Sequence, residues 1–292
     1  RLSEVAPDLA KQTVADAVTI GVMSQPEDIC LLRHDGSGKN AFKNPLSFRY
    51  LDDNFIESDA VKIGKTFMDY LKKTKDPRIH VYCSLKDGNT EFDKQFGLPN
   101  GYDSHTIADA PSGSFVGLEN TSNFNINTIL RLDAPTIFLM PSETKLLLAE
   151  AVLRNWTNGN AEVLYKEAIT SSMKEQEIAY GTQGKITDEE IETYLAQNLL
   201  STANNTEKLQ IIGEQYWVAT FINGYESYAN WRRTGYPKLI PTNYSGSMSP
   251  GVIPTRLPYP TDEYSINRAN VDTANQQQGA DKVTTHIWWD ID

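Results

Sequence analysis

The chain has 292 residues, of which 39% are hydrophobic, enough for one large or two ordinary domains with a sizeable core. A formal net charge of −11, without a dense run of Lys and Arg, argues against nucleic acid as a partner. No stretch approaches the roughly 18 uninterrupted apolar residues of a membrane span. The two cysteines, Cys30 and Cys83, show no C-x-x-C spacing, so neither a disulfide framework nor a zinc site is predicted.

The first half of the chain predicts two helices followed by loops. Residues 8–20 place Ala, Leu and Val at helical spacing and stop at Gly21, which can take the left-handed conformation that closes a helix. Residues 58–74 predict a second helix with Ser58 as its N-cap. Residues 86–135 are dense in Gly, Asn, Ser, Asp and Pro without a sustained period, which indicates loops with short strands.

Helical periodicity returns in a predicted repeat region at residues 136–235. Ser142 can cap a first helix, the turn at 157–160 ends it, and a second helix from Ala161 completes a hairpin. The pair fits the roughly 34-residue period of tetratricopeptide-type units. A capping box at residues 187–190 predicts a third helix.

A fourth, long helix is predicted from about Thr206 to Arg233, so that two helical hairpins stack. Arg232 and Arg233 then fall in its last turn, where unpaired carbonyls and the helix dipole favour cations. Because adjacent arginines point to different faces, one of them can alternatively pair with Glu226 or Asp262 while the other caps the helix.

Two segments near the C-terminus carry a resemblance to a known family. Residues 216–241, YWVATFINGYESYANWRRTGYPKLIP, and residues 253–267, IPTRLPYPTDEYSIN, resemble the C-terminal signature of the SusD/RagB family of surface nutrient-binding lipoproteins. In that family a long helix ends in Trp-Arg-Arg-Thr-Gly, here 231–235, and an Arg-x-Pro-Tyr-Pro-x-x-Glu segment follows, here 256–263. Further support comes from RLSEVAP at 1–7, YLKKTKDPRI at 70–79, PSETKLLLAEAVLRNW at 141–156 and IWWD at 287–290.

The resemblance implies one SusD-like domain over residues 1–292, mainly α-helical, built on tetratricopeptide-like hairpins with long loops as its ligand face. It implies a non-catalytic protein without a cofactor, held on the surface of the cell outer membrane by a lipid anchor above a SusC-like TonB-dependent transporter. Family members carry roughly another half-domain upstream, with the lipidated cysteine. Because the chain begins at Arg1, we interpret it as a mature form, an expressed piece or a fragment that lacks this half. The signature residues are expected to be structural: Trp231, Arg232, Arg233, Arg256 and Glu263.

Glycan binding needs aromatic faces that stack on sugar rings, flanked by amide and hydroxyl groups. The loops at 86–135 supply both kinds of group. Taken one at a time, each aromatic residue is more often a pin that holds its loop to the scaffold than a ligand contact. We rank Tyr102 and Phe124 first, because an apolar ring in so polar a neighbourhood is least explained by core packing. The candidate ligand contacts are Tyr102, Phe124, Phe96, Phe92, Phe115 and Asn123.

Enzyme signatures are not supported by the sequence. The histidines are scattered without an H-E-x-x-H motif, no G-x-S-x-G elbow occurs, and the adjacent Asp262 and Glu263 make a poor hydrolytic pair. IGKT at 63–66 lacks the first glycine of a phosphate loop and falls inside the predicted second helix. No calcium loop motif appears, so no metal ligand is assigned.

Three classes of function therefore stay open: capture of a glycan, capture of a peptide or another nutrient by the same scaffold, and a generic tetratricopeptide-type interaction module. Aromatic loops rich in amides favour a sugar ligand. The long Pro-rich segments argue against the generic module, because repeat proteins of that type bind in a concave helical groove without such insertions.

Overall fold

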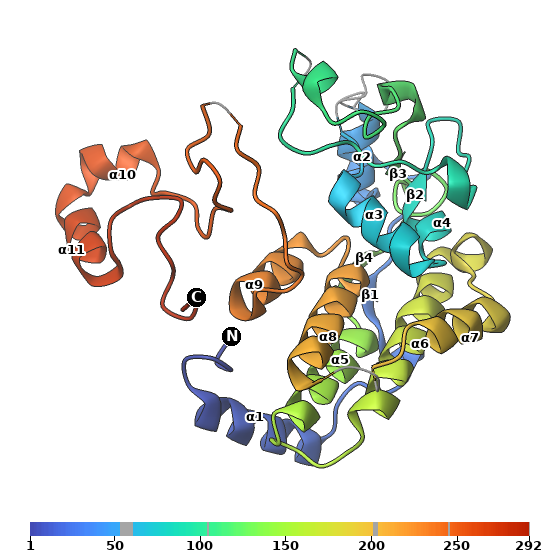
Figure 1. Ribbon diagram of the computed structural model, residues 1–292, viewed down its shortest axis with the longest axis horizontal. Helices are drawn as coiled ribbons and strands as arrows, with labels where there is room; N and C mark the ends of the chain where they lie inside the picture. Colours follow the sequence, from blue (N-terminus) through green and yellow to red (C-terminus); the bar gives the residue numbers. More distant parts are fainter. Residues whose placement is uncertain (53–60, 104, 201–203, 245, 292) are drawn as a thin grey trace.

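The computed structural model describes residues 1–52, 61–103, 105–200, 204–244 and 246–291. It is mainly α-helical, as predicted, with two short antiparallel pairs of strands (Figure 1). The elements in these residues are α1 (Pro7–Ile20), β1 (Cys30–Leu32), α2 (Pro45–Asp52), α3 (Lys65–Thr74), α4 (Ile79–Tyr82), β2 (Cys83–Ser84), β3 (Asn123–Phe124), β4 (Thr136–Leu139), α5 (Pro141–Leu153), α6 (Ala161–Tyr180), α7 (Asp188–Gln197), α8 (Asn205–Ala219), α9 (Gly224–Thr234), α10 (Thr261–Ile266) and α11 (Arg268–Gln278).

Helices α5, α6 and α8 pack together in the helical body, and α7 lies at its edge beside α6 (Figure 1). α5 packs along α6 as the predicted hairpin, and the Asn160 side chain caps α6 by accepting hydrogen bonds from two N–H groups of its first turn. α8 packs on α5, and β1 pairs with β4 just before α5 begins. The strands β2 and β3 pair at the other end, beside α4, where the loops gather. The largest buried side chains of the core include Tyr165, Met68, Leu71, Leu146, Ile169 and Met173.

The prediction of one long fourth helix is wrong. α8 ends at Ala219 and α9 begins at Gly224, because the Asn223 side chain accepts a hydrogen bond from the N–H of Glu226 and starts a new helix. An N-cap residue has non-helical dihedral angles, so the chain turns there. α8 packs mainly on α5 and also on α6, while α7 packs on α6.

The predicted helix over 58–74 begins later than its sequence pattern. Ser58 lies outside the described residues, residues 61–64 are not helical, and α3 begins at Lys65. The backbone at 61–64 instead pairs with a loop, where the Leu98 N–H donates to the Ile63 carbonyl at 2.7 Å. The IGKT sequence therefore stands at the start of a helix rather than inside one.

Three other helix ends test the capping rules. Gly21 closes α1 with a φ of 110°, and Thr187 caps α7 through the predicted capping box. Ser142 does not cap α5, because Pro141 occupies the first helical position and Met140 the N-cap. Proline at that position loses no hydrogen bond, since the first N–H groups of a helix are unpaired in any case.

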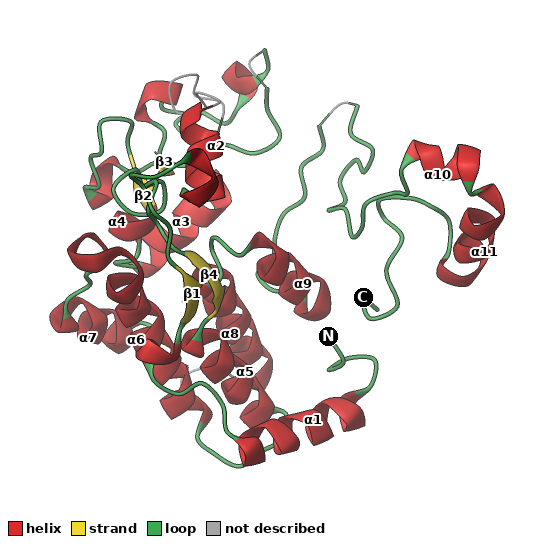
Figure 2. Cartoon of the chain, turned by 180° about the vertical axis from the view of Figure 1, so that it is seen from behind, coloured by secondary structure: helices red, strands yellow, loops and turns green. Residues whose placement is uncertain are grey.

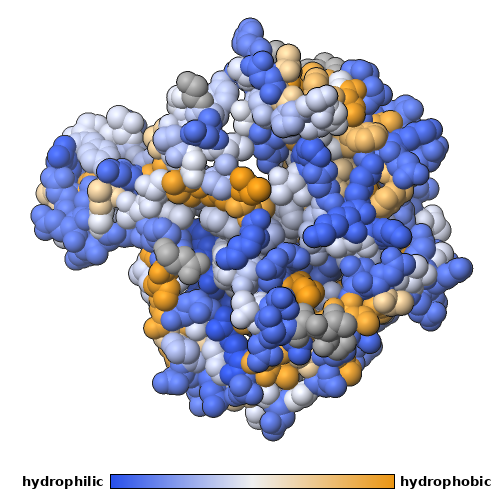
Figure 3. Space-filling model, in the orientation of Figure 1, coloured by the Kyte–Doolittle hydropathy of each residue, from blue (hydrophilic) through white to orange (hydrophobic). Residues whose placement is uncertain are grey.

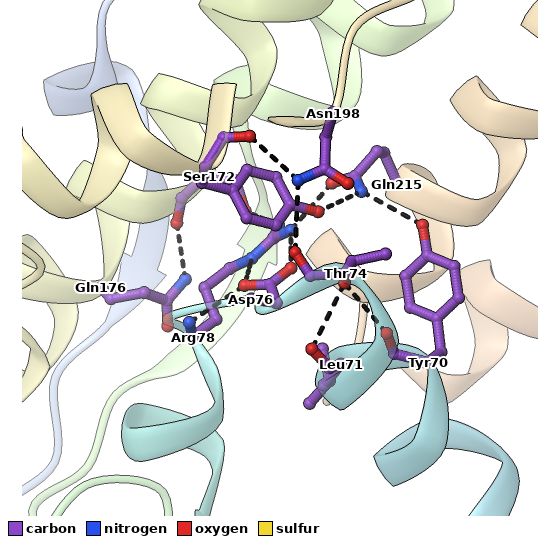
Figure 4. A network of polar contacts seen from close by, with 10 residues as sticks. Tyr70, Leu71, Thr74, Asp76, Arg78, Ser172, Gln176, Asn198 and Gln215 are labelled. Atoms are coloured by element: carbon purple, nitrogen blue, oxygen red, sulfur yellow. Dashed lines mark hydrogen bonds and ion pairs between the residues drawn. The ribbon is translucent and has the colours of Figure 1, made fainter. Parts of the chain in front are cut away.

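A buried ion pair connects the turn after α3 to the helical core (Figure 4). The Arg78 guanidinium is 0% exposed and donates to both carboxylate oxygens of Asp76, at 2.9 and 2.5 Å. It also donates to Ser172 Oγ of α6 at 3.0 Å and to Gln215 Oε1 of α8 at 2.8 Å. Burial alone would lower the pKa of Arg78, but the Asp76 carboxylate outweighs burial and raises it. This residue therefore joins α3, α6 and α8 as a charged, fully bonded group.

Arg233 is also paired inside the protein, with a partner that the sequence did not indicate. It donates to both carboxylate oxygens of Glu150 in α5, at 2.6 and 2.7 Å, instead of to Glu226 or Asp262. Arg232 lies between aromatic rings, with its guanidinium carbon 4.1 Å from the ring centroid of Tyr228 and 4.7 Å from that of Trp289. The two arginines thus point to different faces, as predicted, and both hold α9 to other segments.

After α9, residues 236–244 and 246–291 form an arm with α10 and α11 that lies to one side of the helical body (Figure 2). Arg256 donates to Asp281 Oδ1 at 2.8 Å, and the same carboxylate accepts from the Tyr259 N–H. Glu263 accepts from the Asn267 side chain at 2.8 Å, and the ring of Trp231 stacks on Tyr228. The described side chains of the signature therefore make internal contacts within α9, α5 and the arm.

We predict that Arg78→Ala lowers the free energy of unfolding by about 3 to 5 kcal/mol, because it leaves the Asp76 carboxylate buried without its partner. Denaturant titration measures this loss. The control is Lys94→Ala, which breaks an exposed ion pair with Glu91 and should leave the unfolding midpoint unchanged. Equal midpoints for Arg78→Ala and the wild type would show that the buried pair does not stabilise the fold.

Glu143 of α5 is a buried carboxyl, 6% exposed, whose Oε1 atom has no hydrogen-bond partner in the described residues. Burial, followed by the negative charges of Glu226 and Glu175, raises the pKa of Glu143 from 4.5 to about 8. The folded protein therefore favours its neutral form.

The stability that this neutral carboxyl contributes is complete below pH 4.5 and is lost as the pH rises through about 8. Glu143→Gln cannot ionise, so it should remove that loss. We expect the Tm difference between the variant and the wild type to move in the variant's favour across this range, by scanning calorimetry. Parallel pH profiles would contradict the prediction.

Candidate functional site

The loop at residues 90–102 lies against α3 and is bonded to the backbone at its start, where Gly64 and Leu98 form a parallel bridge. The Lys65 N–H donates to the Leu98 carbonyl at 2.7 Å, so the loop backbone touches the first turn of the helix. Gly97 makes this approach feasible, because a Cβ atom there would lie 2.4 Å from the Lys65 Cα atom. The loop that carries the predicted ligand residues is therefore held directly on a core helix.

A cavity of about 540 Å³, which we call the Tyr102 cavity, opens between α3, this loop and the Pro-rich segment after α9. Its volume lies within the range of small-molecule sites. Tyr102 is half-buried and contributes the aromatic ring of the wall. Hydroxyl, amide and charged groups of the wall come from Thr66, Ser114, Thr242, Asn100, Asn243, Lys65 and Asp69, beside the apolar residues Pro99, Pro111, Ile240 and Pro241.

The Pro-rich wall of the Tyr102 cavity is fixed to the loop by two contacts. Gly101 has a φ of +86° and lies so close to Thr242 that a Cβ atom would come within 2.9 Å of it. The Tyr244 hydroxyl donates to the Asp103 carboxylate. This bond, with backbone N–H groups from His105 and Thr106, lowers the pKa of Asp103 well below its ordinary value. Asp103 is therefore an anion that holds the two walls together.

Phe92 and Phe96 lie at the other end of α3. The Lys72 Nζ atom is 4.2 Å from the ring centroid of Phe96 and 5.9 Å from that of Phe92. Phe92 also lines a second cavity of about 560 Å³, the Phe92 cavity. This cavity lies between α4, the loop and α7, and its other lining residues include Lys75, Pro77, Ile79, His80, Glu189, Thr193, Tyr194 and Gln197.

The remaining predicted contacts do not converge with Tyr102. The ring of Phe124, in β3, packs at 5.5 Å from both Tyr50 and Phe221, in an aromatic cluster of the core. Asn123 is buried beside it, and Phe115 is half-buried in the loop. As ligand contacts these three stay predictions. The structure gives Phe124 a packing role that its polar sequence neighbours concealed, because its ring partners come from distant parts of the chain.

Residues 240–243 form one wall of the Tyr102 cavity, and sequence reasoning did not include them. The available signal was the break after Gly235, where a Pro-rich stretch follows a helix. Proline in such a stretch indicates an extended, pre-ordered backbone suited to forming a rigid wall. The face seen in Figure 1 is mostly hydrophilic, with apolar side chains in separate patches (Figure 3).

Comparisons with known proteins agree with this architecture. A family model described as SusD-like, "Susd and RagB outer membrane lipoprotein", matches residues 1–290. The chain belongs to the SusD-like family. A solved chitin-binding protein is 29% identical, with a TM-score of 0.81, and the match covers 100% of this chain and 61% of that protein. No curated protein matches the chain.

Other solved SusD-like structures share the fold. A Bacteroidetes SusD-like protein is 24% identical, with a TM-score of 0.81 and coverage of 100% of this chain and 67% of its own. A chitin-binding SusD homologue from Flavobacterium johnsoniae is 24% identical, with a TM-score of 0.76 and coverage of 100% and 60%. The chain thus spans between 60% and 67% of these three relatives.

SusD-like proteins are outer-membrane lipoproteins, and membership of this family places the protein at the outer membrane. Within the residues that the structure describes, none of the helices combines the length and the apolar character needed to cross a membrane.

We predict that Gly97→Ala lowers the free energy of unfolding by about 1 to 3 kcal/mol, because the added Cβ atom pushes the loop off the α3 backbone. Denaturant titration tests this. Gly224→Ala is the matched control, since a Cβ atom at Gly224 meets no atom within 4 Å, and it should not destabilise the protein. Equal stability of the two variants would contradict the close approach.

Proposed function

We propose that this protein captures a glycan at the Tyr102 cavity and delivers it to a SusC-like TonB-dependent transporter in the outer membrane. The observation that carries the proposal is the composition of that cavity: one half-buried aromatic ring among hydroxyl and amide groups. A sugar ring has an apolar face that stacks on an aromatic ring and hydroxyls that bond to such groups. Two solved relatives are chitin-binding proteins, which supports a glycan as the ligand.

Chitin oligosaccharides are the first ligands to test, because the 29% identical relative is a chitin-binding protein. An acetylated amino sugar presents both amide and hydroxyl groups, which Asn100, Asn243 and Thr242 can bond. A charged ligand is less suited, since Lys65 and Asp69 in the same wall already form an ion pair at 2.7 Å.

The experiment is native affinity electrophoresis of the 292-residue protein against a panel of soluble polysaccharides that includes glycol chitin. We expect retardation by at least one glycan. Tyr102→Ala should weaken binding about tenfold, the scale of one lost aromatic stacking contact, while Tyr102→Phe should retain most of the affinity. Tyr225→Ala removes a tyrosine that is 91% exposed on α9 and serves as the control.

No retardation by any polysaccharide would overturn the glycan assignment and direct the search to peptides. Retardation that survives Tyr102→Ala would move the site away from this cavity. Co-purification of an outer-membrane barrel with the full-length protein tests the proposed transporter separately.

A further inference from the structure

The Tyr102 cavity and the Phe92 cavity lie at opposite ends of one helix. Lys65, at the start of α3, lines the first, and Lys75, just after its end, lines the second. α3 has 10 residues, which at 1.5 Å per residue gives a length of roughly 15 Å. The two cavities are thus separated by about one short helix.

The loop at 90–102 runs the same distance beside α3 and joins the two cavities. Phe92 lines the Phe92 cavity, Phe96 lies against Lys72, and Leu98 is bonded to Lys65 at the edge of the Tyr102 cavity. We call α3 together with residues 90–102 the α3 seam. Both segments, α3 and the loop, pass from one cavity to the other without a break in the described residues.

The surface of the α3 seam carries side chains that a polymer could touch. Lys65, Asp69 and Lys72 recur at helical spacings of four and three, so they share one face of α3. Phe96 is 39% exposed, next to Lys72 on that surface. An exposed ring among charged groups is poorly explained by core packing and well suited to stacking on a ligand.

We infer that the α3 seam is a binding track for an extended, uncharged polysaccharide, with the Tyr102 cavity and the Phe92 cavity as its two end subsites. The inference rests on the proposed glycan-binding function. The Phe92 cavity offers the ring of Phe92, with Thr193 and Gln197 as polar groups, which is similar chemistry to that of the first cavity. A short sugar fills the Tyr102 cavity, which is the proposed primary site, whereas a long one reaches the Phe92 cavity as well.

Occupying both subsites with one molecule makes the second contact intramolecular, so affinity rises with ligand length. The test is calorimetric titration of the 292-residue protein with chitobiose and with a long soluble chitin oligosaccharide, and with maltose and a long maltodextrin as a second pair. We expect at least one long ligand to bind about tenfold or more tightly than its short counterpart.

The variant Phe92→Ala/Phe96→Ala should lose this gain for the long ligand while binding the short one like the wild type. Tyr102→Ala should weaken both. Phe138→Ala, which removes an exposed phenylalanine of β4, is the matched control and should change neither. If the double variant does not fold, as judged by circular dichroism, Phe96→Ala alone serves, because its ring is at the surface.

Binding without a length dependence, or a length dependence that survives the Phe92→Ala/Phe96→Ala change, would overturn the track and leave the proposed function standing. No binding of any of the four sugars would overturn the track as well. The proposed function itself fails only if the wider polysaccharide panel also gives no retardation.

Discussion

The Asp76–Arg78 ion pair fixes the position of α3 against the helical body, and the proposed binding region is built on α3. A fully buried guanidinium is tolerated only when its charge and hydrogen bonds are satisfied, and here that requires Asp76, Ser172 and Gln215 to be in place together. These groups come from the turn after α3, from α6 and from α8. The requirement therefore sets one arrangement of α3 against the helical body, and the loop at 90–102 is bonded in turn to α3.

The same network extends from the ion pair to a cavity wall. Gln215 donates to the hydroxyls of Tyr194 and Tyr70, and Tyr194 lines the Phe92 cavity. Tyr194 is only 2% exposed, and its hydrogen bond from Gln215 holds the ring in one orientation. The buried charge thus contributes to the shape of a cavity wall as well as to stability.

Sequence patterns predicted those parts of the fold that depend on neighbouring residues. α1, α6 and α7 have the predicted places because their ends are coded locally, by Gly21, Asn160 and Thr187. The prediction of a long fourth helix is wrong for a local reason too, because the Asn223 cap interrupts an otherwise continuous apolar stripe. Arg233 was placed correctly in its helix, but its partner Glu150 lies 83 positions away, and no local pattern indicates such a pair.

The candidate site shows the same division. Tyr102 could be selected from its polar surroundings, whereas the wall at 240–243 that faces it comes from beyond α9. Phe124 satisfied the same selection rule and yet packs on Tyr50 and Phe221, which only the folded chain brings to it. Local composition can therefore nominate a ring, but only the tertiary fold decides whether that ring faces a cavity or the core.

The signature arginines hold the scaffold of the protein together, whereas the proposed ligand contacts lie in a loop. The arginines of the C-terminal signature are used in contacts inside the protein, Arg233 with Glu150 and Arg256 with Asp281. Phe92 and Tyr102, which line the two cavities, stand in the loop at 90–102, outside the signature. The arginine contacts of the signature therefore do not determine which rings line the cavities, so the proposed glycan ligand must be argued from the loop chemistry and not from the family alone.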